Sequence, residues 1–312
     1  MNVLITGGTG FIGSHITREL ANSGETVIAY DLYPNTERIR DVTKNVKIVL
    51  GDVSDYATLM TTIKKEKVSH IIHLAYVTDI SGSQQRPLYA VNSNCTGYLN
   101  IIEAARVMDV ERVVCASSRD VYGPSDYYPR QPVTEDDPVK PTNVYGSCKA
   151  FNEFLAEQYH KIYGIDIVNL RPTIVYGPGR HFRGVAYYTV DLFLNPVKGE
   201  PVYLNCGDLR INIVYVKDVA RAFVLALKAQ KIRHLVYNVG GEETLVRDIA
   251  SCVKKLIPSA SIQIEDGCGP FVQFPRIDSS RAREDFGYDL LYPLERGVKE
   301  YIEYFRESLS RN

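Results

Sequence analysis

A tyrosine and a lysine lie one helical turn apart in the stretch NVYGSCKAFNEF, at Tyr145 and Lys149. Of the 22 tyrosines in the chain, only Tyr145 has a lysine at the fourth following position. A free phenol has a pKa near 10, so only about one part in a thousand is ionised at pH 7. A neighbouring cation can lower that pKa by about one to three units, which makes the phenolate a workable general base. The alternative is a tyrosine that only packs in the core.

Two serines lie where they can complete this chemistry. Ser117 and Ser118 end an apolar segment, residues 112–118, that we expect to be a strand. The helix that Tyr145 opens should begin near the end of that strand, at the same edge of a parallel sheet. A serine hydroxyl there can hold a substrate oxygen while Tyr145 exchanges its proton.

A glycine loop indicates where NAD binds. Gly7, Gly10 and Gly13 in TGGTGFIGSH follow the first apolar run and open a predicted helix. Such glycines permit a tight turn, a close approach to pyrophosphate, and close packing of helix and strand. The phosphates would lie at the helix N-terminus, where free N–H groups favour anions. No Gly-Lys-Ser/Thr follows, which argues against a nucleoside triphosphate loop, and a turn without ligand is the alternative.

An acidic residue indicates which dinucleotide is bound. Asp31 ends the second predicted strand in IAYDLYP, 18 residues beyond Gly13. A carboxylate at this position accepts hydrogen bonds from the adenosine ribose and repels a 2′-phosphate, so we expect NAD. Arg38 and Arg40 lie farther on, in a stretch expected to be solvated, and NADP is the alternative.

These residues need a scaffold of alternating strands and helices. The first 177 residues alternate β-branched runs with stretches of helical periodicity, and the runs are 3–6, 26–30, 46–50, 70–75, 112–118 and 166–171. Most runs are apolar along their whole length, which is typical of strands that are buried on both faces. We therefore predict an α/β fold, a Rossmann-type doubly wound parallel sheet. Between the fourth and fifth runs, residues 92–108 read as one helix.

A smaller domain is expected after residue 177. Helical periodicity returns at 185–198, 244–257 and 294–309, while 211–229 reads as a strand leading into a helix, and 234–241 as a strand. The predicted NAD-binding domain comprises residues 1–177 and 213–241. The predicted substrate domain, interleaved with it, comprises 178–212 and 242–312 and closes over the C-terminal edge of the sheet.

Composition narrows the function classes. The 312 residues are 45% hydrophobic and 23% charged with a net charge of −1, which fits a globular enzyme and excludes a nucleic-acid or membrane-surface footprint. No run approaches the roughly 20 apolar residues of a membrane span, and the N-terminus lacks a signal-peptide pattern. The six cysteines form no CxxC pair and no zinc spacing. We therefore expect a cytoplasmic protein with reduced thiols and no metal.

Several motifs together resemble one enzyme family. TGGTGFIGSH, GDV (51–53), HLA (73–75), NCTG (94–97), SSRDVYG and YGSCK occur in the order of the extended short-chain dehydrogenase/reductases. LRPTIVYGPG (170–179), VYVKDVARAFVLAL and the ending from DSSRAREDFGY resemble its NAD-dependent nucleotide-sugar epimerase/dehydratase branch, of the UDP-glucose 4-epimerase type. The likeness covers nearly the whole chain.

The resemblance implies a role for particular residues. Ser118, Tyr145 and Lys149 would be catalytic, with Ser118 preferred to Ser117 because the family's hydroxyl lies three residues before the valine of VYG. The implied cofactor contacts are Gly7, Gly10, Phe11, Ile12, Gly13, Asp31, Leu32, Asp52, Val53, Leu74, Ala75, Asn94, Tyr145, Lys149 and Pro172. Asp52 and Val53 would meet the adenine, and Asn94 would order the active site. The candidate substrate contacts are Tyr76, Arg119, Asp120, Arg180, His181 and Arg210. The alternative for Tyr76 is that it only forms part of the wall of the site.

Two departures from the family concern the substrate phosphates. The family's arginine before the VYV strand is matched by Ile211, with Arg210 next to it, and neighbours on a strand point to opposite faces. A second family arginine precedes the position of Asp278 by some distance, but here the nearest arginine is two residues before it. Arg180 and His181 could supply the charge, or could belong to a solvated loop.

A third departure concerns dehydration. The family's dehydratases follow their catalytic threonine with an Asp-Glu pair, whereas Arg119 and Asp120 follow Ser118 here. One carboxylate cannot readily act as both the acid and the base of a dehydration, so this activity is disfavoured. Arg119 would bind a substrate carboxylate or form a salt bridge with Asp120.

The sequence thus predicts an NAD-dependent sugar epimerase, in the first place a nucleotide-sugar 4-epimerase that retains NAD through a transient keto sugar. The alternative is an NAD-dependent dehydrogenase of a sugar, sugar acid or hydroxy amino acid that releases NADH. A third class, an NAD-sensing protein without activity, is at odds with the presence of Tyr145 and Lys149. The resemblance also implies a homodimer formed through helices at 94–107 and 145–163, whose apolar positions a partner could cover.

Overall fold

A parallel sheet forms the centre of the molecule. The structure, a computed structural model, describes residues 1–180, 184 and 186–310. Within them, the sheet has seven strands in the order β10-β6-β5-β4-β1-β2-β3. The strands are β1 (Asn2–Thr6), β2 (Thr26–Asp31), β3 (Val46–Leu50), β4 (His70–His73), β5 (Arg112–Ala116), β6 (Ile167–Pro172) and β10 (Val236–Val239). The strand order diverges between β1 and β4, and ligands bind at such a switch point. The predicted Rossmann-type sheet is confirmed.

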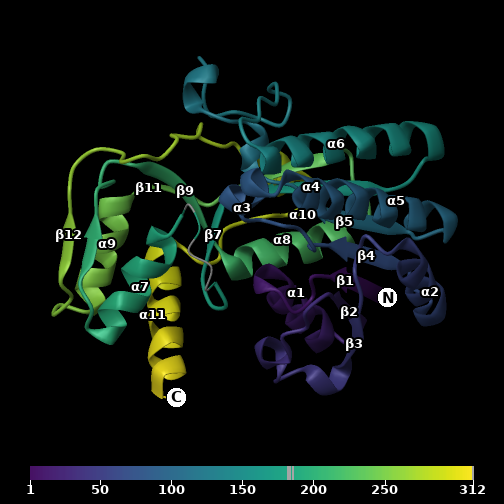
Figure 1. The fold of residues 1–312 in the computed structure, drawn as a ribbon, viewed down its shortest axis with the longest axis horizontal. Coiled ribbons are helices and arrows are strands. Elements are labelled where there is room, and N and C mark those ends of the chain that lie inside the picture. Colours follow the sequence, from purple (N-terminus) through teal and green to yellow (C-terminus); the bar gives the residue numbers. More distant parts are fainter. Residues whose placement is uncertain (181–183, 185, 311–312) are drawn as a thin grey trace.

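Helices cover both faces of this sheet, which explains why its strands are apolar throughout (Figure 1). One face carries α1 (Phe11–Asn22) and α8 (Val216–Lys228), and the other carries α2 (Tyr56–Glu66), α5 (Gly97–Val107) and α6 (Val144–Tyr163). Neighbouring residues of β1 show the consequence. Ile5 packs in the core beneath α1 and α8, whereas Leu4 packs beneath α2 and α5, and both are fully buried.

The helix predicted over residues 92–108 is present as α5, but its first turn is π-helical, and further short helices precede it in the segment after β4. That segment contains α3 (Ile80–Gln85), α4 (Pro87–Val91) and a π-helical turn, η3 (Asn92–Thr96), before α5 begins at Gly97. The side chain of Asn94 in this turn bonds to the backbone of Val77 instead of facing solvent. Single π-turns inside helices often mark functional sites, and hydrophobic periodicity does not reveal them.

The C-terminal half builds a second, smaller layer of structure, seen at the left of Figure 1. A three-stranded sheet has the order β11-β9-β7, and a separate pair joins β8 to β12. These strands are β7 (Ile174–Tyr176), β8 (Val202–Leu204), β9 (Arg210–Tyr215), β11 (Glu242–Leu245) and β12 (Ile262–Ile264). Helices α7 (Tyr188–Lys198), α9 (Val246–Leu256) and α11 (Leu294–Ser310) enclose a core of their own with these strands.

The two layers are joined where β9 leads into α8. The predicted domain boundary at residue 213 falls inside β9, and the division into two domains stays a prediction. The short α10 (Ser280–Phe286) packs back against β10 of the central sheet. None of the helices in the described part of the chain combines the length and hydropathy that a membrane span needs.

His15 of α1 connects the first layer to the loop after β7. Its Nε2–H donates to the carbonyl oxygen of Pro178 at 2.9 Å, and burial lowers the pKa of the imidazole to about 4. In the unfolded chain a histidine has a pKa near 6.5, so the unfolded state takes up this proton first. The stability that neutral His15 contributes is complete above pH 6.5 and is lost as the pH falls toward 4.

We therefore expect His15→Gln, whose amide can still donate to Pro178, to make the protein less sensitive to acid. The proton uptake should lower the free energy of unfolding of the unmodified chain by up to about 3 kcal/mol over this pH range. Urea unfolding of both proteins at pH 7 and pH 4.5 measures the difference. Equal losses of stability in the two proteins would contradict the role given to His15.

Candidate active site

A cavity of about 730 Å³ extends over the carboxyl ends of the central strands. One end is lined by the glycine loop together with Asp31, Leu32, Asp52 and Val53. Leu74, Ala75, Tyr76, Ser118, Asp120, Tyr145, Lys149 and Pro172 line its middle, and Arg119, Arg180, Tyr188, Arg210, Phe271 and Phe274 line its other end. Of the predicted site residues, Asn94 lies behind the wall, and His181 falls outside the described residues.

The glycine loop is shaped by close backbone contacts. Gly7 has a φ of +69°, and the N–H of Gly10 donates to the Gly7 carbonyl oxygen at 2.9 Å. A Cβ atom at Gly13 would lie 2.0 Å from that same oxygen, so a side chain cannot fit there without opening the turn. Helix α1 begins directly afterwards with no side-chain cap and no acidic residue in its first turn. Its first N–H groups therefore suit a phosphate.

Asp31 stands beside this loop, at the end of β2. Its Oδ2 accepts hydrogen bonds from the Thr9 hydroxyl at 2.7 Å and from the Thr9 N–H at 3.2 Å. Its Oδ1 has one long contact, 3.4 Å from the Tyr33 N–H. Since a carboxylate has about four acceptor sites, Asp31 can still accept from ribose hydroxyls in the cavity. The residues at this end therefore fit an adenosine diphosphate group.

The two serines after β5 point to different partners. The Ser117 hydroxyl donates to Glu153 in the interior. The Ser118 hydroxyl donates to the Asp120 carboxylate at 3.0 Å and is within hydrogen-bonding reach of the Tyr145 phenol. Ser118 is thus the serine that the structure brings together with Tyr145.

Tyr145 owes its position to the start of α6. Asn143 caps the helix, since its Oδ1 accepts a hydrogen bond from the Gly146 N–H at 2.8 Å. A Cβ at Gly146 would lie 2.6 Å from the carbonyl oxygen of Asp120, so glycine allows α6 to approach the turn after Ser118 closely. Cap and glycine together place the phenol beside the serine.

The ammonium group of Lys149 contacts the backbone of β5 and a second tyrosine ring. Its ammonium nitrogen donates to the Ala116 carbonyl at 2.5 Å, lies 2.8 Å from the centre of the Tyr76 ring, and lies 5.5 Å from the centre of the Tyr145 ring. Burial raises the pKa of Tyr145, the nearby Asp120 raises it further, and the Ser118 hydrogen bond only partly opposes them. The pKa of Tyr145 is therefore raised, whereas the Tyr–Lys spacing in the sequence led us to expect a lowered pKa. Burial likewise lowers the pKa of Lys149.

Comparisons with known proteins agree with this arrangement. Residues 3–240 match the model of the NAD dependent epimerase/dehydratase family. The chain belongs to this family.

Several known proteins are similar to this chain over nearly its whole length. A putative UDP-glucose 4-epimerase of Methanocaldococcus jannaschii is 29% identical over 98% of the chain and 99% of its own length, and UDP-glucuronate 4-epimerase 3 of Arabidopsis thaliana is 27% identical over 97% and 76%. The structure of UDP-glucose 4-epimerase from Thermotoga maritima, with UDP-glucose, is 26% identical with a TM-score of 0.88, covering 99% of this chain and all of that one. A partial consensus L-threonine 3-dehydrogenase is 26% identical with a TM-score of 0.87, covering 98% and 100%.

In this chain, arginines and aromatic rings line the end of the cavity that lies away from the glycine loop. The Nη1 of Arg180 donates to the Val175 carbonyl oxygen at 3.2 Å, while its buried Nε has no partner among the described residues. Burial lowers the pKa of Arg180, as expected for a cation without a counter-ion. Arg210, at the start of β9, is exposed and lies 3.9 Å from a carboxylate oxygen of Glu243. Ile211, at the family's arginine position, is buried.

Asn94 acts from behind this wall. Its side-chain oxygen accepts from the Val77 N–H at 2.7 Å, its amide donates to the Val77 carbonyl at 3.0 Å, and its own carbonyl accepts from Asn152 of α6. The residue therefore joins η3, α6 and the segment that follows Ala75. It positions the cavity wall without lining the cavity.

A buried ionic network, which sequence reasoning missed, supports the floor of the site. Glu153 of α6 forms a two-point ion pair with Arg171 of β6, with distances of 2.8 and 2.6 Å, and it also accepts from Ser117. Arg171 donates to Tyr122 at 2.6 Å. A signal was available, because Glu153 lies one turn after Lys149 on a helix face that is otherwise buried.

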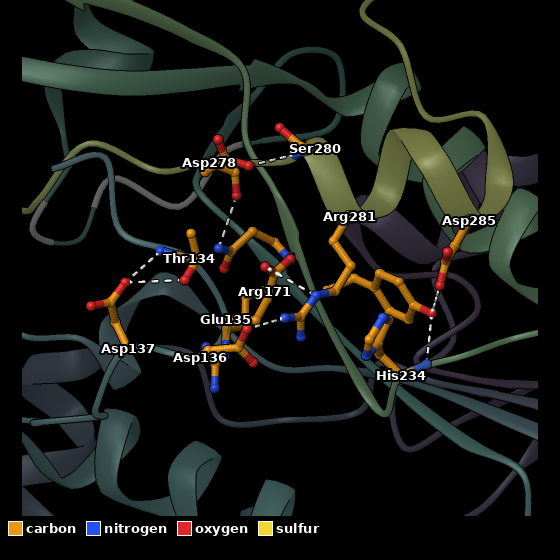
Figure 2. A network of polar contacts seen from close by, with 12 residues as sticks. Thr134, Glu135, Asp136, Asp137, Arg171, His234, Asp278, Ser280, Arg281 and Asp285 are labelled. Carbon is orange, nitrogen blue, oxygen red and sulfur yellow. Dashed lines mark hydrogen bonds and ion pairs between the residues drawn. The ribbon is translucent and has the colours of Figure 1, made fainter.

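The network continues to the C-terminal segment, as Figure 2 shows. Asn238 of β10 accepts from Tyr122 and donates its N–H to Glu135 at 2.7 Å. Arg281 reaches from α10 to Glu135 at 3.5 Å and to Asp136 at 2.6 Å. Helix α10 is thus connected through polar contacts to α6, the helix that carries Tyr145.

Proposed function

We propose that this chain is an NAD-dependent nucleotide-sugar epimerase, in the first place a 4-epimerase that oxidises its substrate transiently and retains NAD. One observation carries the proposal. The pair Ser118 and Tyr145 lies in the middle of a single cavity, between an end that fits a dinucleotide and an end that holds arginines. A substrate anchored at the arginines would present a sugar hydroxyl to the pair.

The dinucleotide end would hold NAD with its pyrophosphate on the N-terminus of α1 and its adenosine ribose on Asp31. Asp52 and Val53 would flank the adenine. NAD would supply the hydride acceptor and, in its oxidised form, a positive charge close to the phenol.

The chain's own residues would handle the proton. Ser118 would release Asp120 and donate its hydrogen bond to the substrate oxygen, holding it against Tyr145. Tyr145 would take the hydroxyl proton as hydride leaves the carbon. It would return the proton after the keto sugar has rotated to present its other face. Because burial keeps the phenol protonated, it needs positive charge nearby to act as a base, and Lys149 would be one source of this charge when it is protonated.

The arginines favour a substrate with a diphosphate. Arg180 is a partly buried cation whose Nε has no hydrogen-bond partner within residues 1–180, 184 and 186–310, and the carboxylate contact of Arg210 in these residues is a long one, with Glu243. Either can bind phosphate oxygens by paired hydrogen bonds, in place of the family's missing arginines. The similarity to a putative UDP-glucose 4-epimerase and to a UDP-glucuronate 4-epimerase supports the same substrate class.

The second candidate is a dehydrogenase of a small hydroxylated substrate. Ile211 replaces a phosphate-binding arginine, and the structural similarity to an L-threonine 3-dehydrogenase is as strong as that to the epimerase. Such an enzyme would use the same three residues and release NADH.

One experiment separates the two. The protein is incubated with NAD and a panel of nucleotide sugars, sugar acids and hydroxy amino acids, while NADH absorbance and product stereochemistry are followed. An isomerised nucleotide sugar without net NADH is the expected result. Stoichiometric NADH from a small substrate, with no isomerisation, would replace the proposal by the second candidate.

We further propose that the chain forms a homodimer through α5 and α6. These helices leave apolar side chains exposed to solvent, among them Leu99, Phe151, Phe154 and Ile162. A second copy could cover them in a four-helix packing. Sedimentation should give twice the chain mass of 35.1 kDa, and Phe154→Asp should reduce it to the mass of one chain. A monomer in the unsubstituted protein would refute the dimer.

A further inference from the structure

Arg119 is a cation in the cavity that forms an ion pair with no carboxylate in the described part of the chain. Its guanidinium carbon lies 4.1 Å from the centre of the Phe274 ring. The sequence left open a salt bridge with Asp120, but that carboxylate accepts from the hydroxyl and shapes the turn of Ser118 instead. A cation held at a cavity wall without a counter-ion favours an anionic ligand.

The aromatic partner of Arg119 is itself held in place. Phe274 belongs to a segment that is docked on β9, since the neighbouring Gln273 accepts from the Arg210 N–H at 3.2 Å and donates to the Arg210 carbonyl at 2.6 Å. A cation–π contact of this kind leaves the N–H edge of the guanidinium available to a ligand. That edge suits the two oxygens of a carboxylate.

The position of Arg119 limits where that carboxylate can be. Ser118, which would hold the reacting oxygen, is the preceding residue, and both side chains line the same cavity as Tyr145. Arg180 and Arg210 are available for the diphosphate, which a sugar carries across the ring from carbon 4. Of the three described arginines that line the cavity, Arg119 is the one that directly follows Ser118, so we assign it to the reacting carbon and its neighbours.

We propose that Arg119 binds a carboxylate on the carbon next to the reacting carbinol carbon, so that the substrate is a β-hydroxycarboxylate. The inference rests on the proposed function only in placing the reaction at Ser118 and Tyr145. In a nucleotide sugar this pattern is a uronic acid, whose carboxylate is attached to carbon 5, next to carbon 4. A β-hydroxy amino acid has the same pattern, which makes the inference compatible with either activity.

Binding tests the inference without requiring turnover. Tyr145→Phe protein loaded with NAD is titrated calorimetrically with UDP-glucuronate and with UDP-glucose, which differ only in the carboxylate. The uronate should bind roughly 10- to 100-fold more tightly, and Arg119→Met in the same background should remove this preference. Arg119→Lys should restore part of it. Equal binding of the two sugars, or a preference that survives Arg119→Met, would overturn the proposal.

Arg210→Met is the matched control, because its charge is assigned to the diphosphate. This substitution should weaken the binding of both nucleotide sugars by a similar factor and leave the ratio of their affinities unchanged. If Arg210→Met removes the uronate preference and Arg119→Met does not, the carboxylate lies elsewhere and the inference fails.

Turnover separates this inference from the proposed function. In protein with Tyr145 intact, isomerisation of UDP-glucuronate that is lost in Arg119→Met supports both the epimerase proposal and the inference. NADH formed from L-threonine or 3-hydroxybutyrate, and lost in Arg119→Met, supports the inference while the epimerase proposal fails. Isomerisation of UDP-glucose in preference to UDP-glucuronate leaves the epimerase proposal in place and overturns the inference.

Discussion

Tyr145→Phe should lower kcat by roughly 10²- to 10⁴-fold, because it removes only the hydroxyl that exchanges a proton with the substrate. The ring would stay in place at the start of α6, where Asn143 and Gly146 fix the backbone. NAD affinity should therefore change little. Initial rates on the accepted substrate, together with NAD titration by fluorescence, measure both quantities.

Tyr163→Phe is the matched control for this change. Tyr163 ends the same helix and is half exposed, so the loss of its hydroxyl should leave kcat unchanged. The assignment of Tyr145 fails if its phenylalanine variant retains the turnover of the control.

Gly13→Ala should weaken NAD binding by roughly 10- to 100-fold. The new methyl group would lie 2.0 Å from the Gly7 carbonyl oxygen and 2.9 Å from its carbon, so the turn must open. Overpacking of this kind costs about 1–3 kcal/mol, and here it displaces the loop that would hold the pyrophosphate. Isothermal titration with NAD gives the change in Kd.

Gly24→Ala distinguishes this effect from general destabilisation. Gly24 follows the other end of α1 with a φ of +81° and has open space around it. Alanine there should cost about 1–2 kcal/mol of stability through backbone strain while leaving NAD affinity unchanged. Equal losses of NAD affinity in the two variants would mean that the turn at Gly13 has no special role.

The sequence was sufficient for much of this account because the decisive features are local. Apolar runs predicted the central strands, and the glycine spacing predicted a turn that leads into α1. The helix bearing Tyr145 and Lys149 was also predicted, since its periodicity lies within one segment.

What the sequence could not predict depends on three-dimensional packing. The pKa of Tyr145 is raised because the phenol is buried and Asp120 lies nearby, and spacing along a helix contains neither fact. The π-turn at Asn94 arises from hydrogen bonds to Val77, 17 residues away in the chain. Likewise, Phe274 reaches Arg119 from a distant segment, so the freedom of that arginine from Asp120 appears only in the fold.

The most direct test of the central claim is the fate of the hydrogen on the reacting carbon. The enzyme is allowed to turn over its nucleotide sugar in D₂O, and the product is examined by NMR. Transfer to NAD and back predicts a product with no solvent deuterium on that carbon, because hydride does not exchange with water. Deuterium at that position in each turnover would show proton abstraction from carbon and contradict the role given to Ser118, Tyr145 and NAD.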